Sequence, residues 1–472
     1  MTSSLKVLRA KIRNLSVINK LAGAGFTGNV YLVGGAIREL ALGGLPRDYD
    51  FALDHPDDLA ILERVFEARA FLLGKKPIQT HRIVPHDVTI DVTFIRDGIA
   101  SDLARRDFTM NAIGYDVASG ELLDPFGGLQ DIKRRCIRSP RADAIRDDPL
   151  RMVKAVRHAA TLKGFFLDHV LLEAIHTHRE LIHSTASERI KYELDLIMLS
   201  SDAHRAIKLM RETDILFELF PELRALKEMD EEKGFELETL GHTLDGFAYL
   251  KRARRLHEFS ERDKKYAGWG LLFHDLGKAY TFSYDEAKGR VHFFYHERHS
   301  SEIAGKIMER LRFSVAEARS ISTLIEQHMR LFLISNREAT ERATRRAVYK
   351  LEDLIPSLVL LTLLDMYGSS GGKENATTRQ VKRRCREVLA AYDEWRREPL
   401  SRLVTGHDLL QLGFTEGAAL GSVLSTIREK QIAGEMKVRE EALSYARKAL
   451  QEEQSQQTSG SDQSSVISEE QE

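Results

Sequence analysis

Three aspartates in the first hundred residues have a spacing that could hold divalent metal ions. Asp48 and Asp50 lie two residues apart in a predicted strand, so both carboxylates lie on one face. Apolar and polar residues alternate from 88 to 94 in another predicted strand, which places Asp91 opposite the apolar side. Carboxylates on adjacent strands could bind two Mg²⁺ ions, which would activate an attacking hydroxyl and neutralise a triphosphate leaving group. The alternative is a solvated strand face without function.

A two-glycine turn precedes this pair of aspartates. The run 31–38 indicates a strand, then Gly34 and Gly35, then the start of a helix that carries Arg38. Such a turn lets backbone amides approach a phosphate, and Arg38 adds a positive charge. Most Gly-Gly pairs are ordinary turns, so this pair gains meaning only from the aspartates that follow it.

A second group of residues suits a transition metal, because imidazole and carboxylate are ligands for such ions. Its members lie in successive predicted helices: His242, the adjacent pair His274 and Asp275, His296, His328 and Asp365. The chain has 17 histidines, and a single histidine usually packs or lies at the surface, so the prediction rests on the group as a whole. His299 could replace His296 as a ligand, and the sequence leaves this choice open.

The elements that must position these residues change along the chain. Short β-rich runs alternate with turns from 30 to 129, whereas apolar residues recur at helical spacing from 149 onward. These patterns predict an α+β fold, in which a mixed α/β head precedes a mostly α-helical body that contains the histidines. We predict five segments: a head (1–148), a helical neck (149–230), a histidine-bearing helical domain (231–372), a C-terminal helical region (373–450) and a disordered tail (451–472), which has few residues to bury.

Composition limits the class of protein. Lys and Arg total 70 against 71 for Asp and Glu, so overall charge neither indicates nor excludes a nucleic-acid partner. Cys136 and Cys385 offer neither a disulfide framework nor a cysteine-based zinc site, which favours a reducing compartment. No apolar run approaches the roughly 20 residues of a membrane span, and the N-terminus lacks the features of a secretory signal. We therefore expect a cytoplasmic protein without a membrane partner.

The order of several short blocks resembles a known family. After the glycine pair come five blocks in family order, at 48–50, 105–112, 124–128, 147–151 and 188–190. This order resembles that of the class II tRNA nucleotidyltransferases, which include CCA-adding enzymes, and of bacterial poly(A) polymerases. The match covers about residues 20–225, and residues 406–441 resemble the C-terminal helical part of some members.

The resemblance implies roles for residues of the head and neck. Asp48, Asp50 and Asp91 would be the catalytic carboxylates, with Asp48 and Asp50 binding the catalytic Mg²⁺. The residues that the resemblance places beside the incoming nucleotide are Gly34, Gly35, Arg38, Arg106, Asp107, Asn111, Asp148, Arg151, Arg157 and Arg189. Asp107 could also cap a helix. Arg157 and Arg189 could instead be structural ion-pair arginines.

Asp148 and Arg151 match the positions that read the edge of the base in this family. Their i, i+3 spacing predicts that both lie on one helix face, although an ordinary surface ion pair would have the same spacing. The chain departs from the family pattern at Asp147, which replaces a glutamate. A basic run at 133–141 could contact phosphates of the tRNA acceptor stem, or it could be a solvated charge run.

The run 272–278, in which Gly-Lys follows the pair His274 and Asp275, resembles the signature of an HD phosphohydrolase domain. The resemblance implies a second metal site with the ligands His242, His274, Asp275, His296, His328 and Asp365. Bacterial members with such a domain can hydrolyse phosphate esters there. The sequence leaves open whether this site is active and which transition metal it binds.

The resemblance implies an enzyme that adds CMP, AMP or both, from CTP and ATP, to the 3′ end of tRNA without a template. The rivals are a poly(A) polymerase and an HD-type phosphohydrolase whose head only binds RNA, although the latter would not need Asp48, Asp50 and Asp91. Only 15 residues separate Asp91 from Asp107, whereas members that complete CCA usually carry a longer flexible loop here. The short segment resembles that of members that add only CC.

Overall fold

The structure is a computed structural model, and it describes residues 2–73, 79–86, 88–233, 238–335, 341–398 and 400–465. The chain forms two compact units. Unit 1 comprises Met1–Glu232 and Ile307–Phe313, and unit 2 comprises Lys233–Lys306 and Ser314–Glu472. The five segments predicted from the sequence are finer than this division and stay a prediction.

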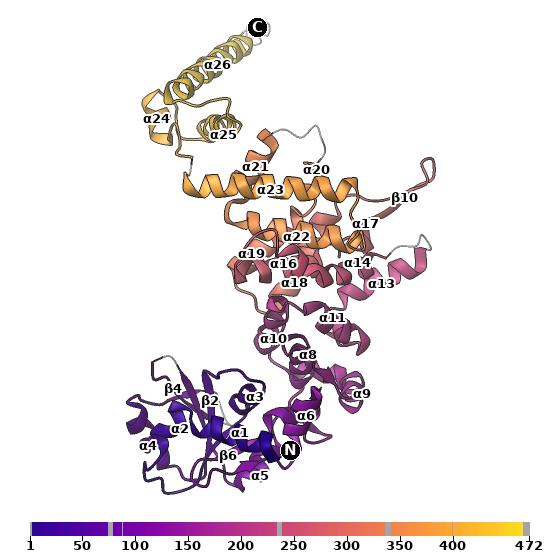
Figure 1. The fold of residues 1–472 in the computed structure, drawn as a ribbon. Helices are drawn as coiled ribbons and strands as arrows, with labels where there is room; N and C mark the ends of the chain where they lie inside the picture. The colour runs from indigo at the N-terminus through magenta and orange to yellow at the C-terminus, as the bar shows by residue number, and fades with distance from the viewer. Residues whose placement is uncertain are drawn as a thin grey trace. The chain divides into compact units, whose positions relative to one another are not determined.

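A seven-stranded mixed sheet forms the centre of unit 1 (Figure 1). Its strands are β1 (Val30–Val33), β2 (Asp48–Leu53), β3 (Phe71–Leu73), β4 (Thr80–Ile83), β5 (Thr89–Phe94), β6 (Gly114–Asp116) and β7 (Leu122–Leu123). They are ordered β3-β4-β5-β2-β1-β6-β7, and only the pair β2 and β5 is parallel among them. Leu32, Phe51 and Val92 have no exposed surface, because β1, β2 and β5 lie at the centre of the sheet.

Unit 1 also contains helices, some of which pack on the sheet while those later in the chain pack on one another. In unit 1 they are α1 (Thr2–Arg13), α2 (Ser16–Leu21), α3 (Gly35–Ala41), α4 (Asp58–Phe66), α5 (Gly98–Ala104), α6 (Gly128–Arg134), α7 (Ala144–Asp147), α8 (Arg151–Thr161), α9 (His169–His178), α10 (Ser187–Leu199), α11 (Ala203–Glu212), α12 (Ile215–Leu219) and α13 (Glu222–Lys233). Helix α3 packs against β2, and α8 packs against α10 and α11. Two short strands, β8 (Cys136–Ile137) and β9 (Phe166–Leu167), pair in parallel beside α8.

Unit 2 is built almost entirely of helices, which confirms the predicted α+β class with a mostly helical body. They are α14 (Thr239–Gly246), α15 (Leu250–Ala253), α16 (Glu261–Phe273), α17 (Lys278–Thr281), α18 (His296–Arg310, which begins in this unit), α19 (Val315–Glu326), α20 (Arg330–Leu333), α21 (Glu341–Leu351), α22 (Ile355–Ser369), α23 (Ala376–Arg397), α24 (Gly406–Gln411), α25 (Ala418–Ile432) and α26 (Arg439–Ser465). A hairpin of β10 (Phe282–Asp285) and β11 (Arg290–Phe293) interrupts them.

Helix α22 forms the core of unit 2, because every residue from Ile355 to Gly368 is buried. Helices α14, α16 and α23 pack against it (Figure 1). Gly368 makes the approach of α14 possible, since a Cβ atom at this position would lie 2.3 Å from the carbonyl oxygen of His242. A side chain here would therefore push His242 away from the centre of the unit.

The C-terminal helices have a small core of their own, which includes Val404, Leu409, Phe414 and Ile427. Helix α26 continues to Ser465, so the disorder predicted from residue 451 is wrong as far as the helix reaches. The Gln and Glu residues at the start of this stretch are good helix formers even where there is little to bury. The remainder of the predicted tail lies outside the described residues. No helix among the described residues is long and apolar enough to span a membrane.

Candidate functional site

The parallel pairing of β2 and β5 brings the predicted carboxylates together. Asp50 lies directly opposite Asp91 in the register, and Asp48 lies two residues before Asp50 on the same face. In β5, Asp91 is partly exposed between the buried residues Ile90 and Val92, so the predicted alternation is confirmed. The structure therefore places all three aspartates at one end of two adjacent strands.

These carboxylates repel one another. Burial raises the pKa of the Asp50 carboxyl, and the charges of Asp91, Asp107 and Asp48 raise it further against the opposing effect of Arg106. Hard oxygen donors that carry like charges close together suit a cation such as Mg²⁺, which would reduce the repulsion. The chemistry of these donors therefore suits a divalent metal ion, although among the described residues the groups of three ligand atoms within 4.8 Å of one another all lie in the histidine-bearing region.

Arg82 was not predicted from the sequence, although it is the direct partner of Asp91. Its Nε and Nη2 atoms donate to the two carboxylate oxygens of Asp91, both at 2.7 Å, from the neighbouring strand β4. This two-point contact fixes the plane of the Asp91 carboxylate. A sequence signal existed, because Arg82 alternates with the buried Ile83 in a short β-rich run.

The glycine turn lies against this group of charges. Gly34 has a φ of +80°, and a Cβ atom there would lie 2.7 Å from Oδ2 of Asp50 and 2.8 Å from Nη1 of Arg106. Both the backbone conformation and the close approach therefore require glycine at this position. Gly35 then begins helix α3, whose residue Arg38 folds back toward it.

Asp102 orients the arginines of the Arg105-Arg106 block. It lies on α5, is 3% exposed, and accepts hydrogen bonds from both Arg105 and Arg106. The Nε and Nη2 atoms of Arg106 lie 3.1 and 3.0 Å from Oδ2 of Asp102, which leaves Nη1 next to Gly34. The sequence analysis missed Asp102, although its i, i+3 and i, i+4 spacing to the two arginines could have revealed it.

Asn111 joins two of the other nucleotide-binding candidates. Its side-chain oxygen accepts from Arg38, and its amide donates to Asp107 at 2.8 Å. Burial lowers the pKa of the Arg38 guanidinium, while Glu39 and Asp107 raise it. Asp107 also accepts from the backbone amide of Phe108, but it does not cap the short helix that follows, because Phe108 occupies the cap position.

The expected placement of Asp148 and Arg151 on one helix face is wrong. Asp148 has an extended conformation between α7 and α8, with φ of −146° and ψ of 97°, and Arg151 only begins α8. The cause is Pro149, because the residue before a proline is restricted to extended conformations. Asp148 accepts instead from Arg189, at 3.0 Å. Arg151 donates to two backbone carbonyls, those of Ala144 and Arg105.

The last nucleotide-binding candidate, Arg157, forms a largely buried ion pair. Its Nε atom donates to Glu193, whose side chain is 5% exposed. The guanidinium group also lies against the buried ring of His158, and burial followed by the charge of Arg157 holds the pKa of that imidazole well below its usual value. This geometry favours the structural role that the sequence left open for Arg157.

The histidine group is assembled within unit 2, where His242, His296 and Asp365 lie on α14, α18 and α22. His274 and Asp275 directly follow α16, and His328 lies between α19 and α20, so these three are not in helices as predicted. The Nε2 atom of His242 lies 2.9 Å from Oδ2 of Asp275, and that of His274 lies 3.6 Å from Oδ1 of Asp365. The Nε2 atoms of His296 and His328 are 3.3 Å apart. The ligand atoms form overlapping groups of three within 4.8 Å: His242, His274 and Asp275; His274, His328 and Asp365; Asp275, His296 and His328.

The backbone orients three of these rings in the same way. The Nδ1 atoms of His274, His296 and His328 lie 2.7 to 2.9 Å from the carbonyl oxygen three residues earlier, which turns each Nε2 atom inward. His299 is exposed, and its Nδ1 atom lies 3.1 Å from the carbonyl oxygen of Tyr295. The geometry therefore includes His296 and leaves His299 outside the group.

The donor set of this group fits a metal ion. Nε2 of His274 and Oδ1 of Asp275 are buried without a hydrogen-bond partner, which is expected of atoms that bind a metal ion. Burial lowers the pKa of His328 to about 4, so this imidazole is neutral and can act as a ligand. Gly277 allows α18 to approach, because a Cβ atom there would lie 2.2 Å from the carbonyl oxygen of His296.

Comparisons with protein families agree with this arrangement. Residues 78–138 match the poly(A) polymerase head domain, and residues 164–227 match the probable RNA- and SrmB-binding site of polymerase A. Residues 239–367 match the HD domain. The A-adding tRNA nucleotidyltransferase of Deinococcus radiodurans is 31% identical over 431 residues, which cover 89% of this chain and 95% of that protein. The chain belongs to the tRNA nucleotidyltransferase family.

Other members of the family are similar over most of their length. The CC-adding tRNA nucleotidyltransferase of Thermus thermophilus is also 31% identical, over 88% of this chain and 93% of that protein. A CCA-adding enzyme in complex with ATP has the same fold, with a TM-score of 0.64 and 21% identity over 95% of this chain and 98% of that one. The Thermotoga maritima CCA-adding enzyme complexed with tRNA gives a TM-score of 0.61 at 20% identity, over 94% and 98% of the two chains. This tRNA nucleotidyltransferase is therefore an enzyme whose head and HD domains are of metal-dependent types.

Proposed function

We propose that this enzyme adds cytidine residues from CTP to the 3′ end of tRNA and stops before the terminal adenosine. The reaction class rests on the opposed pair Asp50 and Asp91 beside the Gly34 turn. The restriction to cytidine rests on the connection between β5 and α5, which consists only of residues 95–97. Ile95 is buried there, and its amide donates to the carbonyl oxygen of Leu53 at 2.8 Å, so this connection lacks the length of a mobile loop.

Different residues of the head have different roles in nucleotide transfer. Asp48 and Asp50, with Asp91 beside them, would hold Mg²⁺, which supplies activation of the 3′-hydroxyl and neutralises the triphosphate. The turn at Gly34 brings the backbone close to the phosphates, and Arg106 donates to them from the position that Asp102 fixes. Because these donors are in place before the reaction, they can stabilise the charge of the transition state without reorganising.

The neck residues Asp148 and Arg151 select the base in this proposal. Arg151 donates through Nη1 and Nη2 to backbone carbonyls of the head and of α7, which ties the position of the guanidinium to the nucleotide site. Arg189 holds Asp148. A carboxylate and a guanidinium in fixed positions offer an acceptor and donors to the edge of a base, as a template base would.

The test uses tRNA transcripts that end before, within and after CCA, each incubated with a single labelled nucleotide. We expect CTP to extend the transcript without CCA by two residues and ATP to leave the transcript ending in CC unchanged. Efficient addition of one A to CC would contradict the restriction to cytidine. A long A tract would favour a poly(A) polymerase instead.

The buried ligand atoms of the histidine group favour a second function. We propose that this site binds a transition metal through His242, His274, Asp275, His296, His328 and Asp365, and hydrolyses phosphate esters. Soft and borderline metals prefer imidazole ligands of this kind, whereas the carboxylates of the head suit a hard ion. A cytoplasmic location belongs to the same proposal, because Cys136 and Cys385 are both free and buried.

A further inference from the structure

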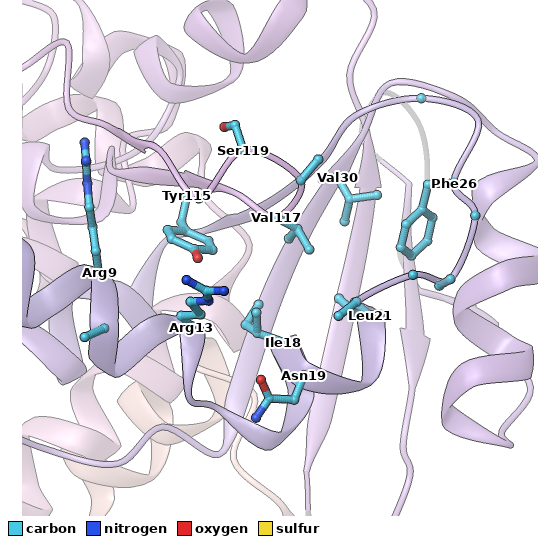
Figure 2. Close-up of a pocket in the computed structure, with 18 of the residues that line it drawn as sticks. Arg9, Arg13, Ile18, Asn19, Leu21, Phe26, Val30, Tyr115, Val117 and Ser119 are labelled. Carbon is cyan, nitrogen blue, oxygen red and sulfur yellow. The ribbon is translucent and has the colours of Figure 1, made fainter.

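A cavity lies at the end of the central sheet that is opposite the aspartates. In the antiparallel pair β1 and β2, Val33 is the partner of Asp50, whereas Val30 is the partner of Leu53. The cavity lies at the Val30 end, between α1, the segment 22–28 and the turn 117–120, and has a volume of about 890 Å³ (Figure 2). It is therefore separate from the catalytic residues, and its volume falls within the range of small-molecule sites.

One side of the cavity is strongly basic. Lys6, Arg9 and Arg13 have i, i+3 and i, i+4 spacing on α1, so they lie in one stripe along the helix. In Figure 2, Arg13 lies next to the ring of Tyr115 of β6, and Arg9 lies on the same side of the cavity. Among the described residues, none of these three cations has a carboxylate within ion-pair distance. Three positive charges without an acidic partner indicate that this side receives an anion.

The carboxylate of Asp116, which follows the lining residue Tyr115, is already used by the backbone. Asp116 accepts hydrogen bonds from the amides of Ala118 and Ser119, at 2.8 and 3.1 Å, and so stabilises the turn 117–120. Burial raises the pKa of the Tyr115 hydroxyl, Arg13 and Arg9 lower it, and Asp116 raises it. One engaged carboxylate against three cations leaves the cavity with a net positive charge.

The other side of the cavity is apolar and offers space for a flat group. Ile18, Leu21 and Val30 are buried and form the floor, and the partly buried ring of Phe26 stands beside them (Figure 2). At Gly25 a Cβ atom would meet nothing within 4 Å, so the backbone lies open here. A basic stripe beside an apolar floor suits a ligand that is anionic at one end and aromatic at the other.

We propose that this cavity binds a nucleotide, either free or within an RNA strand, through phosphate contacts with Lys6, Arg9 and Arg13. The base packs on the apolar floor near Phe26. Guanidinium groups can match phosphate oxygens at two points, and three cations suit a group that carries more than one negative charge. The site is distinct from the catalytic one, so this enzyme holds nucleotide units at both ends of its central sheet.

Photo-crosslinking of the full-length protein tests this proposal without any catalytic turnover. One arm uses 8-azido-ATP, and the other uses a short RNA that contains 4-thiouridine. Labelled residues are identified by fragment mass spectrometry, which separates segments 22–30 and 115–120 from the catalytic turn. The test variant is Arg9→Glu/Arg13→Glu. The control is Lys11→Glu/Lys20→Glu, which reverses two exposed charges on α1 and α2 outside the cavity.

We expect labelling of these segments in the wild type and the control, and a decrease of at least about tenfold in Arg9→Glu/Arg13→Glu. Loss of the 8-azido-ATP label identifies a free nucleotide as the ligand. Loss of the RNA label alone identifies an RNA strand. In that case the slope of RNA affinity against salt concentration should fall by an amount that corresponds to about two phosphate contacts. Absence of label from both probes, or equal labelling in test and control variants, overturns the proposal. Addition of CMP to tRNA is measured separately, so failure of the proposed transfer reaction would not alter these outcomes.

Discussion

The carboxylate site of the head and the histidine site of the HD domain hold their ligands by different means. In the head, a strand register places Asp50 opposite Asp91, and the surrounding arginines keep the group partly charged and open. In the HD domain, helices bury His274 and Asp275 almost completely, and backbone carbonyls orient the rings. The carboxylates of the head therefore stay partly exposed, whereas the histidine group is enclosed by the helices around it.

The two groups also differ in how far solvent and substrate can reach them. A transferase must admit a nucleotide and an RNA end, so its carboxylates have to remain reachable by solvent and by hard ions. A transition metal held by buried imidazole and carboxylate can be kept dry and rigid. If the two sites work independently, changes in one should leave the chemistry of the other intact.

The largest effect should come from Asp50→Ala. Removing this ligand removes stabilisation of the developing charge, so CMP addition to tRNA should fall by at least about 10³-fold, which corresponds to about 4 kcal/mol. The measurement is incorporation of labelled CTP, with circular dichroism to show that the fold is intact. Asp57→Ala is the matched control, because this carboxylate is 83% exposed and lies outside the site. Near-normal incorporation by Asp50→Ala would show that the metal is held elsewhere.

The double variant His274→Ala/Asp275→Ala should abolish metal binding by the histidine group and leave nucleotide addition by the head unchanged. We expect about one transition-metal ion per chain in the wild type by elemental analysis, and none in this variant, because two of the inward-facing ligands are lost. Hydrolysis of bis(p-nitrophenyl) phosphate should disappear, while CMP addition is retained. His299→Ala is the control, since this exposed histidine lies outside the group. Unchanged hydrolysis in the double variant would assign that activity to another part of the enzyme.

Arg151→Ala should affect selection more than rate. Loss of a fixed donor to the base costs about 1–3 kcal/mol of discrimination, or about 5- to 150-fold in the ratio of CTP to UTP incorporation. Competition assays with the two nucleotides measure this ratio directly. Arg146→Ala, a change at an exposed position on α7, is the control. If the ratio stays at the wild-type value, the base is read by other residues.

The smallest effect concerns the buried imidazole beside the head site. Burial depresses the folded-state pKa of His158, so below the usual value of 6.5 the unfolded chain binds a proton that the folded chain does not. The free energy of unfolding therefore keeps its full contribution from neutral His158 above pH 6.5. Below that pH it falls by up to about 1.4 kcal/mol per pH unit. Calorimetry at pH 7.5 and 5.5 measures how far the free energy of unfolding falls between the two pH values. This fall should be smaller for His158→Gln than for the wild type. Equal acid destabilisation of the two proteins would show that His158 titrates alike in both states.

Local patterns in the sequence were sufficient to predict on which face of the sheet the three carboxylates lie. Alternation with a period of two fixes which residues share a face, so the placement of Asp48, Asp50 and Asp91 could be predicted without knowing the partner strands. The same reasoning failed for Asp148 and Arg151, because Pro149 ends α7 before the pair can share a helix. Spacing along a chain predicts a common face only where the element continues.

Contacts that depend on tertiary packing could not be predicted in this way. Arg82 reaches Asp91 only because β4 lies next to β5, and the pairing of Arg157 with Glu193 depends on the packing of α8 against α10. The choice of His296 over His299 depends on which ring faces inward at the start of α18. The roles of these residues in binding and catalysis stay predictions.

The parallel pairing of β2 with β5 also affects how the enzyme is made. Forty residues separate Asp50 from its partner Asp91 in the sequence, and β1 and β2 leave the ribosome well before β5. At about 5–20 residues per second, the interval between the two aspartates lasts about two to eight seconds. During this time the edge of β2 that later binds β5 is unpaired, which makes it a site for aggregation or for a chaperone. The pair of Asp50 and Asp91 therefore does not exist until β5 has emerged.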